Sequence, residues 1–229
     1  MAKNKRYNSA AEKVDPTKKY SIKEGLDLVV EGAKAKFDES IDLTVRLGVD
    51  PKQSDQQVRG AVALPNGLGK EVKILVFAKG PKEQEAKDAG ANFVGSDDLV
   101  EKIKGGWTDF DKALATPDMM ATVAKVAKVL GPRGLMPNPK VGTVTMKIAE
   151  AVTTEKKGKL AYRVEKAGIV HAVIGKKSMG AEQLQQNLDA FMQAIVKAKP
   201  ASSKGTYLKT LSLSSTMGPG IKLELGDYQ

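Results

Sequence analysis

Residues 72–78 read Val-Lys-Ile-Leu-Val-Phe-Ala, and this nearly unbroken apolar run decides the fold of the middle of the chain. Gly80-Pro81 ends the run, and the helix-forming segment 82–90 follows it. A strand that is apolar on both faces is typical of a parallel sheet covered on both sides. We therefore expect residue 72 to open a unit in which strands and helices alternate.

The segments that follow continue this alternation. We expect strands at 91–94 and 112–115, and a helix from Ser96 to Ile103. Asp118 is expected to cap one helix running to Leu130, which Gly131-Pro132 closes. Residues 144–152 suggest a final helix or strand of the same unit. This pattern predicts an α/β domain of Rossmann-like, three-layer architecture.

The flanking segments have another pattern. Ser21-Ile22-Lys23-Glu24 is a capping box, so a helix is predicted over 22–34. Residues 41–49 alternate apolar and polar side chains, which is typical of a half-buried strand, and 58–64 is a second strand candidate. Residues 1–20 suggest a short helix or a flexible basic arm.

The C-terminal part returns to the alternating pattern. Strands are expected at 162–165 and 169–174, joined by the turn 166–168, and a hairpin is expected at 206–214 and 221–225. A long helix from Ser178 to before Pro200 places five apolar residues on one face: Leu184, Leu188, Phe191, Ile195 and Val196.

Both ends of the chain show antiparallel-type strands and one long helix, whereas the middle does not. The simplest topology therefore inserts the middle segment into one domain that both ends form. We expect an α+β domain from residues 1–67 plus 159–229, with an α/β domain at 68–158 inserted. Glycines at both crossings, Gly67, Gly69 and Gly158, tolerate the required backbone angles.

The amino-acid composition excludes several classes of functional site. The chain has 229 residues, a net charge of +10, no cysteine and a single histidine, His171. Disulfides, thiolate metal sites, cysteine nucleophiles and multi-histidine zinc sites are excluded. Gly67-Leu68-Gly69-Lys70 fails the phosphate-loop pattern, because residue 64 is Leu and Glu71 follows the lysine. We expect no enzyme, no cofactor, no metal and no membrane or secretory segment, and a cytoplasmic protein with a polyanionic partner.

Three segments are candidates for contact with nucleic acid. Lys36-Phe37 suits a phosphate and a base or ribose, although a core Phe closing the helix is the competing interpretation. Residues 155–177 carry seven Lys and Arg against two Glu, which suits either a solvated face or a backbone-binding patch. Thr216-Met217-Gly218-Pro219-Gly220 is a loop for an RNA minor groove or a plain hairpin turn.

Residues 131–142, Gly-Pro-Arg-Gly-Leu-Met-Pro-Asn-Pro-Lys-Val-Gly, predict a stiff basic loop, because three prolines and three glycines exclude a helix or central strand. With Val129-Leu130, this loop resembles the signature segment of the large-subunit ribosomal protein L1 family. The 36–42 segment, Tyr162-Arg163 through Lys166, Gly168, His171 and the terminal 214–220 segment resemble the same family. The resemblance covers essentially the whole chain.

The resemblance implies a split β-α-β domain formed by both termini and an inserted Rossmann-like domain. It implies binding of large-subunit rRNA, a mobile stalk at the ribosomal exit site for deacylated tRNA, and repression of the protein's own operon through its mRNA. A monomer is expected when the protein is free. The implied rRNA-binding residues are Lys36, Phe37, Ser40, Arg163, Lys166, Gly168, His171, Thr216, Met217 and Gly218.

Two further points remain open from the sequence. Arg133 and Lys140 of the stiff loop are expected to face RNA or tRNA. Val164 and Glu165 stand where relatives often have a more polar pair. The alternative function from another class is a small-ligand or nucleotide-binding α/β protein.

Overall fold

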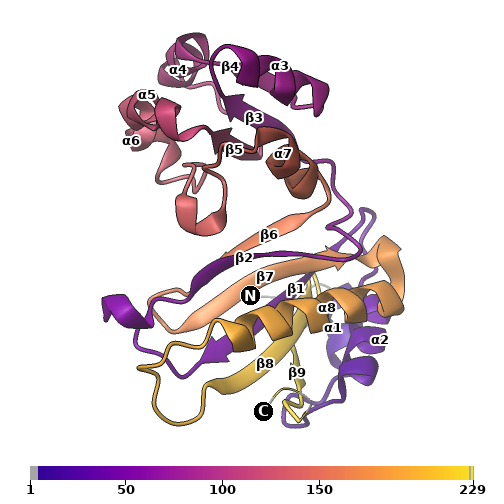
Figure 1. Cartoon of the computed structure of the whole chain (residues 1–229). Coiled ribbons are helices and arrows are strands. Elements are labelled where there is room, and N and C mark those ends of the chain that lie inside the picture. Colours follow the sequence, from indigo (N-terminus) through magenta and orange to yellow (C-terminus); the bar gives the residue numbers. More distant parts are fainter. Residues whose placement is uncertain (1–4, 227, 229) are drawn as a thin grey trace. The chain divides into compact units, whose positions relative to one another are not determined.

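The computed structural model describes residues 5–226 and 228, and the chain forms two compact units (Figure 1). Unit 1 combines the residues up to Gly69 with those from Leu160 onward, and unit 2 is Lys70–Lys159. The first boundary lies after residue 69, two residues beyond the expected boundary after 67. The second lies after residue 159, one residue beyond the expected boundary after 158. Gly67, Gly69 and Gly158 all have positive φ angles, 67°, 65° and 91°, so glycine is required at both crossings.

The sheet of unit 1 is antiparallel and has the strand order β7-β1-β8-β9. Its strands are β1 (Ser40–Leu47), β7 (Ile169–Lys176), β8 (Leu208–Ser215) and β9 (Ile221–Leu223). The hairpin of β8 and β9 confirms the predicted C-terminal hairpin. A second, two-stranded sheet pairs β2 (Arg59–Ala63) with β6 (Lys159–Arg163).

The alternating residues of β1 divide into a buried and an open face, as the pattern predicts. Ile41, Leu43 and Val45 are fully buried, whereas Asp42, Thr44 and Arg46 point to the other face. Helices α2 (Ile22–Gly32) and α8 (Gly180–Lys197) pack on the buried face. A Cβ at Gly25 would collide with Leu223, so α2 lies directly on β9.

Local signals account for the helices of unit 1. The Ser21 hydroxyl accepts from Glu24 N, and the Glu24 carboxylate accepts from Ser21 N, so the capping box is confirmed. In α8, four of the five predicted face residues are fully buried, but Val196 is 40% exposed and was wrongly placed on that face. The short elements α1 (Lys5–Ala11), η1 (Ser54–Gln56) and η5 (Lys177–Met179) complete the described part of this unit.

Unit 2 contains a parallel sheet of order β4-β3-β5 between two helical layers. The strands are β3 (Ile74–Phe77), β4 (Phe93–Gly95) and β5 (Lys112–Ala115), and a bridge from Ala115 to Val144 extends the sheet. One layer holds α3 (Pro81–Asp88) and α7 (Ile148–Lys156), and the other includes α4 (Asp97–Lys104). The predicted α/β architecture is confirmed.

The single helix expected over 118–130 was wrong. The chain there forms four short pieces: η2 (Pro117–Met119), α5 (Met120–Val123), η3 (Ala124–Val126) and α6 (Ala127–Leu130). The residue before this series is Thr116, and Asp118 makes no capping bond. Met119, Val123, Val126 and Leu130 are nevertheless buried. The backbone leaves regular helical angles at Val126, whose φ is −110° and ψ 8°, so 3-10 turns interrupt the α-helix.

The strands expected at 162–165 and 169–174 are present as β6 and β7, with β6 beginning earlier, at Lys159, and β7 running on to Lys176. β6 pairs with β2 and β7 pairs with β1, so they belong to different sheets. The turn between them exists, with Gly168 N donating to Glu165 O at 2.9 Å. The residues 131–142 that were expected to form a stiff loop contain only η4 (Pro139–Val141). No helix in the described residues is long and apolar enough to cross a membrane.

Candidate nucleic-acid interface

The first group of expected site residues gathers around a buried carboxylate. Glu39 is only 1% exposed, and its two oxygens accept from Ala35 N at 2.8 Å and Met217 N at 3.0 Å. The Glu39 carbonyl accepts from Lys177 N at 2.9 Å. Through its side chain and its carbonyl, Glu39 therefore joins the 35–39 segment to two distant ones, at Lys177 and at Met217.

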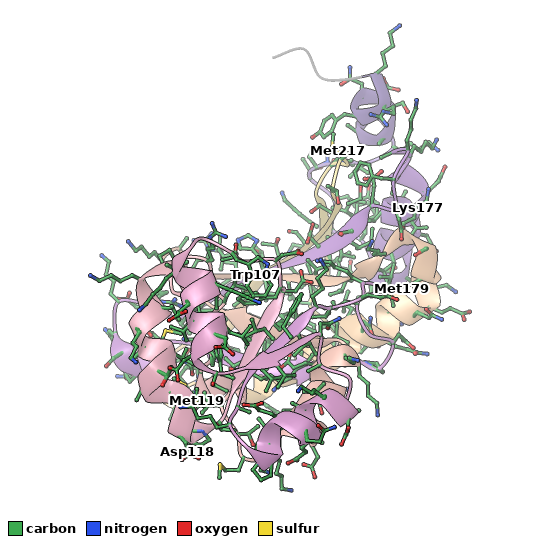
Figure 2. The ribbon with its side chains drawn as sticks, turned by 90° about the horizontal axis from the view of Figure 1, so that it is seen from above. Trp107, Asp118, Met119, Lys177, Met179 and Met217 are labelled. Atoms are coloured by element: carbon green, nitrogen blue, oxygen red, sulfur yellow. The ribbon has the colours of Figure 1, made fainter. Side chains whose placement is uncertain are left out.

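Backbone contacts tighten this junction. Three hydrogen bonds join Ser40 and Thr216. Ser40 N donates to Thr216 Oγ1 at 3.0 Å, and Ser40 O accepts from Thr216 N at 3.1 Å and from Thr216 Oγ1 at 3.3 Å. Met217 and Lys177 are labelled in Figure 2, and the segments that carry them lie in the same part of unit 1. The predicted residues Ser40, Thr216 and Met217 are thus brought together.

Two apolar side chains stand exposed on this junction. Phe37 is 54% exposed and Met217 is 52% exposed. The alternative of a core Phe that closes the helix is excluded by this exposure. Lys36 is exposed beside Phe37. An exposed aromatic ring next to a lysine is suited to stacking on a base while the ammonium group meets a phosphate.

Asp38 fixes the segment from the other side. Its carboxylate accepts from Ser178 N at 3.1 Å and from the Ser178 hydroxyl at 2.7 Å. The Ser178 hydroxyl holds the pKa of Asp38 below its ordinary value. The Lys177 ammonium donates to the Ala33 carbonyl, so it is tied to the backbone at the end of α2.

Gly218 is shaped by packing rather than by an unusual backbone. Its φ lies outside the left-handed region, so the backbone angle alone does not require glycine there. A Cβ there would instead collide with the Ser215 hydroxyl. Gly218 N donates to Ser215 O at 3.1 Å, which makes the loop a tight turn.

The second group lies at the other end of β1. Gly168 is buried with φ +73°, and its carbonyl accepts from Leu47 N at 2.8 Å. A Cβ at Gly168 would come within 3.3 Å of the Leu47 and Val49 carbonyls. Gly168 therefore shapes the turn, whereas Arg163 and Lys166 beside it are exposed.

His171 lies between the two groups on the open face of the sheet. It pairs with Thr44 across the strands, and the Thr44 hydroxyl lies 3.3 Å from His171 Nδ1. Its Nε2 lies 3.8 Å from the Glu165 carboxylate. Seven residue steps along β1, at about 3.3 Å each, span about 23 Å, so the two groups and His171 form one strip.

Unit 2 holds the other expected residues. Arg133 is exposed, and its guanidinium donates to the Thr108 hydroxyl. The Lys140 side chain lies outside the described residues. Asn138 N donates to Thr143 Oγ1 at 2.7 Å, and Thr143 N donates to Asn138 O at 3.2 Å, so the loop is held at its C-terminal side.

Lys70 forms an ion pair in unit 2. Its ammonium donates to Asp111 at 2.6 Å, and this bond lowers the pKa of the Asp111 carboxyl. The Lys70 side chain is 60% exposed, so this is a surface ion pair. Residues 67–70 already depart from the phosphate-loop pattern, and this contact adds no support for a nucleotide-binding α/β protein.

Sequence reasoning missed several residues of the interface. Glu39, Asp38 and Ser178 organise the junction, and none was named as a site residue. The acidic pair immediately precedes β1. Its role depends on the hydrogen bonds to residues 178 and 217, which local patterns do not reveal.

Comparison with known proteins identifies the family of this chain. Residues 29–219 match the model of the Ribosomal protein L1p/L10e family. A relative named large ribosomal subunit protein uL1, from Bdellovibrio bacteriovorus, is 71% identical over 220 residues, which cover 96% of this chain and 94% of the relative. The match spans both units and the residues of the strip. The chain therefore belongs to the ribosomal protein L1 family and is a structural, non-enzymatic protein of the ribosome, a cytoplasmic particle.

Proposed function

We propose that this protein is a component of the large ribosomal subunit and binds large-subunit (23S) rRNA through the strip on unit 1. The observation that carries the proposal is the exposure of Phe37 and Met217 on a backbone held by the buried Glu39. Each side chain leaves about half of its surface open to solvent. Both are placed where bases or riboses of a folded RNA can pack on them.

The two ends of the strip have complementary roles. Lys36 at one end and Arg163 and Lys166 at the other contact phosphates, which position the RNA. Phe37, Thr216 and Met217 contact bases and riboses. His171 lies between them and contacts the RNA along the open sheet. Ser40 and the two glycines, Gly168 and Gly218, hold the backbone in the required shape.

The same surface supports a regulatory role. Contacts to backbone, ribose and loop shape accept any RNA that presents the same fold. We propose that a segment of the protein's own mRNA competes for the strip and that its binding represses translation of the operon. Repression then begins once the rRNA sites are occupied, provided the rRNA binds more tightly.

Unit 2 has a separate role in this proposal. Anchored through unit 1, the protein forms the mobile stalk at the ribosomal E site and assists release of deacylated tRNA. Arg133 and Lys140 of the 131–142 loop face RNA or tRNA in that setting. The relative's name places that protein in the large subunit. In the 131–142 loop of this chain, residues 131–134, which include Arg133, are exposed.

A mobility-shift experiment tests the rRNA proposal with matched variants. Phe37→Ala weakens binding of an rRNA stalk fragment by about tenfold, because stacking of a base on an aromatic ring contributes about 1–3 kcal/mol. Met217→Ala weakens it by up to about tenfold, because an apolar contact is lost. Val196→Ala and Met146→Ala are the controls, since these side chains are 40% and 52% exposed but lie outside the strip. An unlabelled mRNA leader should displace the rRNA fragment from the wild type.

The outcomes separate the parts of the proposal. Equal binding by Phe37→Ala and Val196→Ala would remove Phe37 from the site. No preference of the wild type for the stalk fragment over a scrambled RNA of the same length would refute specific rRNA binding. Simultaneous binding of both RNAs would refute the shared site.

A further inference from the structure

Unit 1 contains a hollow of about 780 Å³ between the loop before β2 and the turn after β6. Its floor includes Val58 and Val164, which are buried and joined by a hydrogen bond from Val164 N to Val58 O at 2.9 Å. Next to it, a Cβ at Gly60 would lie 2.7 Å from the Tyr162 hydroxyl, so the Tyr162 ring packs on the β2 backbone. The floor is therefore fixed by the pairing of two strands.

Three cations line this hollow. Arg59, Arg163 and Lys166 are exposed, and none has an ion pair or side-chain hydrogen bond within residues 5–226 and 228. The alternation of the strands explains the placement, because Val58 and Val164 point inward while their neighbours Arg59 and Arg163 point outward. Three positive charges thus gather around a shaped depression without a partner there.

Glu165 is the acidic residue among those that line the hollow, and it has another contact. Its carboxylate lies 3.8 Å from His171 Nε2 on the open face of the sheet. The carboxylate is thus positioned at the border between the hollow and the strip. It does not neutralise the two arginines by a direct ion pair in the described chain.

We propose that this hollow binds the phosphate backbone of RNA, with Arg59 contacting one phosphate and Arg163 and Lys166 contacting adjacent ones. The inference rests on the proposed function and adds Arg59, which no sequence pattern singled out, to the residues that meet RNA. A guanidinium group is suited to a phosphate because it offers paired N–H donors in a planar fork, and the hollow has two such groups.

The position of the hollow favours RNA over an acidic peptide. It lies beside the Gly168 turn, at one end of the strip, and the Phe37 junction lies about 23 Å away at the other end of β1. One folded RNA can cover both ends, so the phosphate contact and the base contacts belong to one ligand. An acidic peptide would use the arginines but has no bases for Phe37.

The test uses the full chain and an rRNA stalk fragment. Arg59→Ala weakens binding about tenfold and reduces the slope of log K against log salt by about 0.7–0.9, the effect of one lost phosphate contact. Lys23→Ala removes one exposed charge from α2 and changes affinity by less than about twofold. Glu165→Gln strengthens binding by about threefold, because it removes a carboxylate from the rim.

Ethylation of single phosphates in the fragment identifies the contact. We expect one or two phosphates whose ethylation weakens the wild type but has no further effect on Arg59→Ala. If Arg59→Ala behaves as Lys23→Ala while Phe37→Ala still loses affinity, the hollow is not a phosphate site and the proposed function stands. An acidic peptide is also tested as a competitor of the labelled rRNA fragment. If the peptide competes with the wild type but not with Arg59→Ala, and does so at a lower concentration than unlabelled RNA, the hollow belongs to a protein partner. If the wild type shows no preference for the stalk fragment, both proposals fail.

Discussion

The sheets of the two units are built on opposite principles. In β1 of unit 1, buried and outward-facing residues alternate, so one face packs on helices and the other remains open. In β3 of unit 2, all four residues are buried, because helices cover both faces. The comparison shows why the candidate interface is in unit 1: only a sheet covered on one side leaves a polar face for a ligand.

The largest effect is expected when a carboxylate is placed on each face of β3 and of β1. Leu75→Asp and Val76→Asp should both unfold unit 2, because burial of an unpaired carboxylate costs several kcal/mol at either face. In β1, Leu43→Asp should unfold unit 1, whereas Thr44→Asp should leave it folded. Circular dichroism and thermal melts measure this. A stable Val76→Asp would show that one face of β3 is open.

A smaller effect separates two buried glutamates. Glu39 in unit 1 accepts two backbone N–H groups, whereas both oxygens of Glu155 in unit 2 lack a hydrogen-bond partner among the described residues. The Lys159 and Lys112 ammonium groups lie 3.4 Å and 3.9 Å from the Glu155 carboxylate.

Substitution of each glutamate by glutamine measures how much its contacts contribute to stability. Glu39→Gln should lower the free energy of unfolding by about 1–3 kcal/mol, because an amide can accept from only one of the two donors through its oxygen. Glu155→Gln should cost at most about 1 kcal/mol, since it breaks no hydrogen bond and both lysines retain some access to water. Urea denaturation measures both. A larger loss for Glu155→Gln would mean that the ion pairs contribute more than the two N–H bonds to Glu39.

The smallest expected effect concerns the open face itself. Burial raises the pKa of Asp42, although His171 partly opposes this. The folded state therefore disfavours the charged carboxylate, and stability declines as the pH rises from the unfolded pKa through the higher folded pKa. Asp42→Asn should melt about 1–2 °C higher at pH 7, with the gain shrinking toward pH 4.

The same substitution should also strengthen RNA binding slightly at pH 7, because it removes a negative charge from the strip. Asp27→Asn is the matched control, since Asp27 is exposed on α2, which covers the other face. Equal effects of the two substitutions on RNA affinity would show that overall charge matters and that the open face does not.

Short-range signals in the sequence were sufficient for much of the fold. The alternation in 41–47 and the apolar run at 74–77 correctly predicted the two kinds of sheet, because side-chain direction in a strand depends only on residue parity. The Ser21–Glu24 capping box formed as predicted, since its bonds span three residues. The 3-10 turns within 117–130 were missed, because the spacing of the apolar residues in that segment is that of an uninterrupted helix.

The sequence by itself determined the elements, the faces they bury, the basic charge and the glycines at Gly67, Gly69 and Gly158 that let the chain cross between units. Only the tertiary structure decided which surface those elements form. Glu39 meets Met217 across 178 residues, and Arg59 lines the same hollow as Arg163. The physical reason is range: periodicity and capping act over a few residues, whereas these contacts depend on how distant segments pack. Local patterns therefore identified Phe37 as a candidate, and the fold alone revealed the carboxylate that holds its segment against the Met217 loop.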